Sequence, residues 1–116
     1  MKHEEEALQI ACVRWFDYQY PSLSPYLVHV PNGGKRNARE GARFKQMGVR
    51  AGFPDLMLLI PRNGKYGLFI EMKSDKGKPT DSQKKYIELL NNMCYESVIC
   101  NSFVNFVDII NNYLKP

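Results

Sequence analysis

Hydrophobic positions follow two different periods along the chain, and each change of period marks a predicted element. From Glu4 to about Tyr18, apolar residues recur every three or four positions behind an acidic first turn, which predicts an amphipathic helix. Three more helices are predicted. Residues 37–47 look helical and end at Gly48, residues 81–92 follow the capping residue Thr80, and residues 102–113 have apolar side chains on one face. Short apolar or alternating runs predict four strands, over residues 26–30, 56–60, 69–73 and 95–100.

The resulting order, αβαββαβα, predicts an α/β fold with one mixed β-sheet flanked by helices. Residues 61–67 separate two of the strands and contain the pair Asn63-Gly64, which predicts a turn that folds the second strand back on the first. A chain of 116 residues has the size of one domain, so we expect residues 1–116 to form a single unit.

The composition is that of a globular protein, and no apolar run approaches the roughly 20 residues that span a bilayer. The amino terminus is acidic, unlike a signal peptide, so we expect the protein in the cytoplasm of its cell. Three cysteines without paired spacing argue against a zinc site or a disulfide framework.

The net charge of +4 is concentrated in one segment. Residues 35–50 contain six bases and one acid, a local charge of +5, which leaves −1 for the remaining hundred residues. A basic patch on a nearly neutral body is typical of binding to a phosphate backbone, although a solvated helix face gives the same pattern. The residues that we expect to contact DNA are Lys35, Arg36, Arg39, Arg43 and Arg50.

Candidate chemistry lies on the two strands joined by the predicted turn. Asp55 precedes the apolar run 56–60, and Glu71-Met72-Lys73 ends the next strand. Because side chains alternate along a strand, Glu71 and Lys73 share one face, and the hairpin brings Asp55 beside Glu71. Carboxylate oxygens bind Mg²⁺, and a nearby ammonium orients a nucleophile or offsets developing charge. This cluster favours metal-dependent phosphodiester chemistry.

A carboxylate from the first helix is a candidate third acid. Glu5 shares a helix face with Leu8 and Gln9, toward the core side on which the strand acids are expected. Glu4 and Glu6 lie about 100° to either side on the helical wheel, and Glu6 remains an alternative.

Each motif alone is weak evidence for a catalytic site, because Pro-Asp is a common turn dipeptide and Glu-x-Lys often forms an exposed ion pair. Together they are more specific. The run 56–60 is so apolar that both faces of its strand must be covered, and a carboxylate entering such a strand requires a partner.

These residues resemble the virus-type replication-repair nuclease (VRR-NUC) branch of the PD-(D/E)xK nucleases, from residue 5 to about residue 112. The motifs that carry the resemblance are Glu5-x-x-x-Gln9, His29-Val-Pro-Asn-Gly-Gly34, Gly48-Val-Arg-Ala-Gly52-Phe-Pro-Asp55, Glu71-Met-Lys73 and Gln83. The resemblance implies a restriction-endonuclease-like fold and a divalent-metal-dependent endonuclease that hydrolyses DNA.

The resemblance also implies roles for individual residues. The carboxylates of Asp55 and Glu71 and the main-chain carbonyl of Met72 are the expected ligands of Mg²⁺ or Mn²⁺. Glu5 is expected to bind or steer a second ion or its water, and Lys73 to position the attacking water. Gln9 and Gln83 are expected to support this site.

Small members of the family are typical of phages and bacteria, and the resemblance implies homodimers that cut branched DNA such as Holliday junctions. Two alternatives remain open: a nuclease acting on flaps, nicks or DNA ends, and a non-catalytic DNA-binding module. We interpret His29 as a structural imidazole rather than a substrate contact.

Overall fold

The computed structural model describes residues 3–31 and 37–116, and its elements follow the predicted order αβαββαβα. The helices are α1 (His3–Gln19), α2 (Ala38–Gln46), α3 (Asp81–Asn92) and α4 (Phe103–Leu114), with a short 3₁₀ turn η1 (Ser24–Tyr26). The strands are β1 (Leu27–His29), β2 (Leu56–Leu58), β3 (Leu68–Met72) and β4 (Glu96–Cys100). The predicted fold class is confirmed. Strands β1 and β2 are each shorter than predicted, and β3 begins and ends one residue earlier than predicted.

One mixed sheet joins the four strands in the order β1-β2-β3-β4. The pairs β1–β2 and β2–β3 are antiparallel, and β3 pairs with β4 in parallel. Asn63 and Gly64 both have positive φ, 51° and 80°, the backbone that a tight hairpin turn requires. The predicted hairpin therefore forms, with Leu56 opposite Ile70 and Leu58 opposite Leu68.

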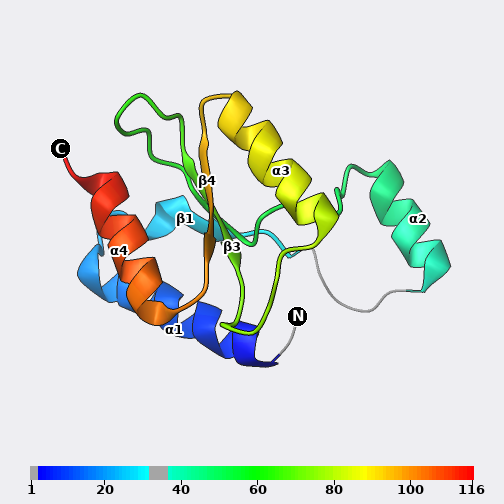
Figure 1. Cartoon of the computed structure of the whole chain (residues 1–116), viewed down its shortest axis with the longest axis horizontal. Helices are drawn as coiled ribbons and strands as arrows, with labels where there is room; N and C mark the ends of the chain where they lie inside the picture. The colour runs from blue at the N-terminus through cyan, green and yellow to red at the C-terminus, as the bar shows by residue number, and fades with distance from the viewer. Residues whose placement is uncertain (1–2, 32–36) are drawn as a thin grey trace.

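Helices cover both faces of the sheet (Figure 1). On one face, α1 and α4 pack over the side chains of Leu68, Ile70 and Met72. On the other face, Phe69 contacts the rings of Phe53 and Tyr95, and Phe53 in turn contacts Tyr86 of α3. Every residue of β3 is buried as a result, including Glu71.

A capping box fixes the start of α3. The Thr80 hydroxyl accepts a hydrogen bond from the Gln83 main-chain N–H at 3.2 Å, and Gln83 Oε1 accepts one from the Thr80 N–H at 2.8 Å. These bonds satisfy two of the donors that a helix leaves unpaired at its first turn. The predicted start of this helix is confirmed.

Helix α2 stands apart from the body of the molecule (Figure 1). It has no buried residue, and it begins at the cap Asn37, whose side chain accepts from the Glu40 N–H at 2.8 Å. Gly48 follows the helix with φ +104°, as predicted for a residue that ends a helix. Among the described residues no helix is long and apolar enough to cross a membrane.

Candidate functional site

Asp55 sits at the junction of three strands. Its side-chain Oδ2 accepts a hydrogen bond from the Met72 main-chain N–H at 2.8 Å, so it is tied to the end of β3. Its main-chain carbonyl accepts from the Val30 N–H at 2.9 Å and from His29 Nδ1 at 2.8 Å, at the end of β1. The sheet therefore fixes both the backbone and the carboxylate of Asp55.

Glu71 lies on β3 on the same face as Lys73, as the strand alternation predicts, and is only 3% exposed. Its Oε2 accepts a hydrogen bond from Gln83 Nε2 at 3.0 Å and lies 3.9 Å from Lys73 Nζ. Its other oxygen, Oε1, is buried and has no hydrogen-bond partner among residues 3–31 and 37–116. In its ionised form the carboxylate thus has one acceptor oxygen without a donor. In its protonated form it can share a hydrogen bond with Asp55.

The surroundings of Glu71 disfavour its charged form. Burial raises its pKa most, and the neighbouring carboxylate of Asp55 raises it further, to about 8. The ammonium of Lys73 lowers the pKa, and the carboxylate of Glu5 raises it. Burial and the neighbouring carboxylates together therefore outweigh the ammonium of Lys73, and a bound cation would favour the charged form of Glu71.

Gln83 links this acid to the helix behind it. Its Oε1 closes the capping box with Thr80, while its Nε2 donates to Glu71. Because the side chain is held at both ends, the start of α3 sets the position of the Glu71 carboxylate. The resemblance implies a supporting role for Gln83, and the same side chain also closes the cap of α3.

Helix α1 presents Glu5 and Gln9 to the interior, 8% and 9% exposed, while Glu4 and Glu6 face outward. A Cβ on Gly77 would lie 3.1 Å from Glu5 Oε2, so the loop after β3 passes directly against this carboxylate. Of the three acids in the first turn, Glu5 is thus the one turned toward the strands. The Gln9 side-chain oxygen is buried without a partner in the described part of the chain.

No three His, Cys, Asp or Glu side chains within residues 3–31 and 37–116 form a ready-made metal site. The donors that the structure does bring together are the carboxylates of Asp55 and Glu71, with Glu5 close enough to influence the pKa of Glu71. The unpartnered Oε1 and the raised pKa both fit a divalent cation, which binds hard oxygens and favours the ionised carboxylate.

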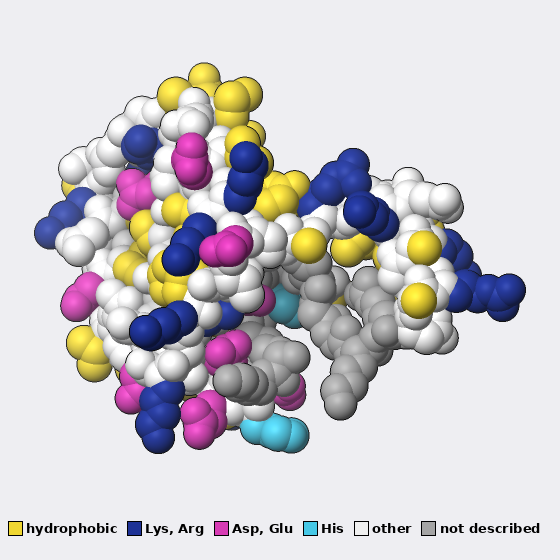
Figure 2. All heavy atoms as spheres, turned by 45° about the vertical axis from the view of Figure 1, so that its right-hand side comes forward, with side chains coloured by type: hydrophobic (Ala, Val, Ile, Leu, Met, Phe, Trp, Pro, Cys, Tyr) yellow, Lys and Arg dark blue, Asp and Glu magenta, His cyan; other side chains and the backbone are white. Residues whose placement is uncertain are grey.

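The predicted DNA-binding residues lie on and beside the projecting helix. Arg39 and Arg43 are exposed on α2, and Arg50 follows it, with Nη1 donating to the Lys45 carbonyl at 3.4 Å. Helix α2 and the turn that follows it, residues 38–50, form the α2 arm, and Figure 2 shows lysine and arginine side chains on it. The other two predicted contacts, Lys35 and Arg36, lie outside the described residues.

His29 is exposed, and its ring nitrogen Nδ1 must donate to the Asp55 carbonyl, because a carbonyl only accepts. This bond fits the structural interpretation of His29, which stays a prediction.

The sequence analysis includes Gly52 in a motif of the resemblance but assigns it no structural role. Its φ is +84°, and a Cβ at this position would lie 2.4 Å from the main-chain carbon of Ser82. Glycine at this position therefore lets the segment that carries Asp55 approach the first turn of α3, which carries Gln83. The only local signal is a glycine shortly before a Pro-Asp pair, which does not reveal the contact.

Comparison with known proteins agrees with this geometry. The sequence matches the VRR-NUC domain family over residues 3–104. Among solved structures, a protein titled "VRR_NUC domain protein" is similar to the chain, with a TM-score of 0.85 and 32% sequence identity over 98% of this chain and 90% of the other. The search of curated proteins finds no match. The chain therefore belongs to the VRR-NUC domain family, nucleases of the PD-(D/E)xK type.

Proposed function

We propose that this nuclease is a divalent-metal-dependent endodeoxyribonuclease that cuts branched DNA, such as the four-way Holliday junction. The observation that carries the metal dependence is the buried Glu71 carboxylate, whose pKa is raised by burial and by Asp55 and whose Oε1 is unpartnered among the described residues. Such a group is ionised at neutral pH when a cation lies against it.

The ligands proposed for Mg²⁺ or Mn²⁺ are the carboxylates of Asp55 and Glu71 and the main-chain carbonyl of Met72. Glu5 is proposed to bind or steer a second ion or its water, which fits its burial on the inner face of α1. When bound, the ion supplies Lewis-acid polarisation of the phosphate and a more acidic water. The protein fixes the ligands beforehand, since the Met72 N–H holds Asp55 and Gln83 holds Glu71.

Lys73 is proposed to position the attacking water and to offset charge that develops on the phosphate. The residue is only 9% exposed and its ammonium lies near Glu71, so its orientation is restricted. Gln9 is proposed to support the site from α1. The exposed arginines of α2, with Arg50, are proposed to hold the DNA backbone without reading its sequence.

Symmetric cutting of a junction suits two active sites related by a twofold axis, so we propose that the chain acts as a homodimer. Each protomer contributes residues 1–116 as one nuclease domain. The substrate would be DNA in the cytoplasm of a bacterial or phage-infected cell.

A nuclease acting on flaps, nicks or ends uses the same chemistry and differs only in the shape of its substrate. A non-catalytic DNA-binding module would use the acids as a structural ion-pair network. An effective structural pair lowers the pKa of its carboxylate, whereas the pKa of Glu71 is raised, and this favours the catalytic interpretation.

The test is a cleavage panel of four-way, flap, nicked and linear DNA with Mg²⁺, with Mn²⁺ and with chelator, beside the mass of the protein in solution. Asp55→Asn and Lys73→Ala should abolish cleavage and leave a folded protein that still binds DNA. The matched control is Asp108→Asn, at an exposed position of α4, which should cut normally. Normal cutting by either site variant would refute the assignment.

A further inference from the structure

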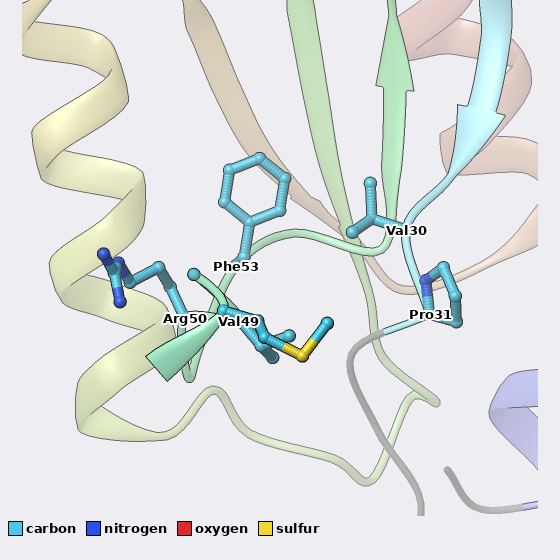
Figure 3. Close-up of a pocket in the computed structure, with 7 residues that line it drawn as sticks. Val30, Pro31, Val49, Arg50 and Phe53 are labelled. Carbon is cyan, nitrogen blue, oxygen red and sulfur yellow. The ribbon is translucent and has the colours of Figure 1, made fainter. Parts of the chain in front are cut away.

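A pocket of about 360 Å³ opens at the foot of the α2 arm, and the proposed chemistry does not use it. Its walls come from three segments that are separate in the sequence: the end of β1, the turn after α2 and the approach to β2 (Figure 3). The residues that line it include Val30, Pro31, Met47, Val49, Arg50 and Phe53.

This pocket adjoins the proposed metal ligand. Phe53 precedes Asp55 by two residues, and the Val30 N–H donates to the Asp55 main-chain carbonyl at 2.9 Å. Two of the pocket walls are therefore joined to the backbone of Asp55, one through the chain and one through a hydrogen bond. These two connections place the pocket beside the backbone of Asp55, the region where the proposed function puts the phosphate to be cut.

The size and lining of the pocket suit one flat, largely apolar group. A volume of about 360 Å³ is at the lower end of the roughly 300–1,000 Å³ typical of small-ligand pockets. The ring of Phe53 is held by edge contacts with Phe69 at 5.7 Å and Tyr86 at 5.4 Å, so this wall is formed in advance. Arg50 also lines the pocket, and its exposed guanidinium extends away from Val30 and Pro31 (Figure 3), so its positive charge lies at the edge of the pocket, where a DNA phosphate can meet it.

We propose that this pocket receives one unstacked nucleobase of the DNA substrate, next to the phosphate to be cut. The inference rests on the proposed nuclease function and gives a physical reason why the nuclease prefers branched DNA to linear duplex. A base at a branch point leaves its stack at lower cost than a base inside an intact duplex, so a nuclease that must accommodate one favours branched DNA. Because the walls are mainly apolar, the pocket holds any of the four bases with little discrimination.

The experiment uses the full chain with a four-way junction that carries the fluorescent base 2-aminopurine at successive positions around the crossover. A linear duplex with the same label is the reference, and a chelator prevents cleavage. Because 2-aminopurine brightens when it leaves the stack, the wild-type protein should raise its emission at a position beside the crossover and leave the linear duplex dim.

The test variant is Met47→Ala and the matched control is Met93→Ala, since both methionines are exposed, 71% and 68% respectively, and only Met47 lines the pocket. Met47→Ala should lose most of the rise in emission and about five- to tenfold of the preference for junction over duplex, the effect of weakening one base contact. Met93→Ala should behave as the wild type.

The outcomes separate this inference from the proposed function. A wild-type protein that cuts junctions with Mg²⁺ but brightens no labelled position retains the nuclease assignment and overturns the pocket. Brightening that Met47→Ala and Met93→Ala both preserve also overturns it. A third outcome is a protein that cuts none of the DNAs but brightens the label, with the brightening lost only in Met47→Ala. This outcome supports the pocket and overturns the cleavage activity.

Discussion

Glu71 should make the metal-free protein less stable as the pH rises. Its pKa in the folded protein is about 8, against an ordinary value of 4.5, so between these values the folded state binds more protons than the unfolded state. The free energy of unfolding then falls with increasing pH. The stabilising contribution of the protonated carboxyl is complete below about pH 4.5 and lost as the pH passes through about 8.

The size of this effect follows from the two pKa values. Each pKa unit corresponds to about 1.4 kcal/mol. Because pH 7 lies below the raised pKa of about 8, only the interval between 4.5 and pH 7 contributes at this pH, and the cost to the metal-free folded state is about 3 kcal/mol. Between pH 5 and pH 9 the cost grows by about 4 kcal/mol. Glu71→Gln removes the titration, and the amide oxygen that it introduces can still accept the bond from Gln83 Nε2. The variant should therefore be more stable than the wild type, increasingly so at high pH.

The assay is urea unfolding of the wild type and Glu71→Gln at pH 5, 7 and 9 in chelator. Titrating groups that do not interact with Glu71 are the same in both proteins, so their contributions cancel in the difference between the two proteins. Glu88→Gln is the matched control, because it makes the same change on the exposed surface of α3. Its difference from the wild type should stay within about 0.5 kcal/mol at every pH.

Adding Mg²⁺ supplies a second measurement on the same proteins. Binding to the folded state raises the free energy of unfolding by an amount that grows with the metal concentration. The wild type should gain stability, most at high pH, and Glu71→Gln should gain little. The reasoning requires that the buried Glu71 carboxyl ionises beside Asp55 as the pH rises. A difference in the free energy of unfolding between Glu71→Gln and the wild type that does not grow from pH 5 to pH 9 would refute it.

Two further predictions concern the support of the site and the DNA-binding arm. Gly52→Ala should lower the free energy of unfolding by about 3 kcal/mol or more, since it adds a collision with Ser82 to the cost of positive φ. Gly48→Ala, also at positive φ but in open space, should cost about 1 kcal/mol, and equal losses in urea unfolding would contradict the contact. Arg39→Ala should reduce the slope of log DNA affinity against log salt concentration by about one charge for every DNA sequence. Arg14→Ala on α1 should leave this slope unchanged. An unchanged slope for Arg39→Ala would place the binding surface elsewhere.

The parts of the fold that local signals specify were predictable from the sequence. The Thr80 capping box sets where α3 begins, the Asn63-Gly64 pair sets the hairpin, and the hairpin brings Asp55 to Glu71. Helical spacing likewise predicts that Glu5 faces inward. Each of these features depends on residues that are close in sequence or on one short turn, so the pattern of side chains is sufficient.

Features that depend on contacts between distant segments were not predictable. Gly52 meets Ser82 only after α3 has packed, and the pocket walls at Val30 and Met47 are brought together by the whole sheet and the α2 arm. The sequence predicts a basic helix over residues 37–47, but nothing in its spacing shows that α2 stands clear of the body. Such arrangements are decided by tertiary packing rather than by local preference.

The burial of Glu71 shows why the chemistry was easier to predict than its energetics. Strand alternation places Glu71 on the face away from Ile70, a position that faces solvent in a half-buried strand. The structure covers that face with α3, so a carboxylate with an ordinary pKa in water becomes a buried one with a raised pKa. A chain selected only for stability has an apolar residue at such a position, and a strained ionisable group there is typical of functional sites. A measured loss of stability at Glu71 in the metal-free protein would therefore support the proposed cation site without any cleavage assay.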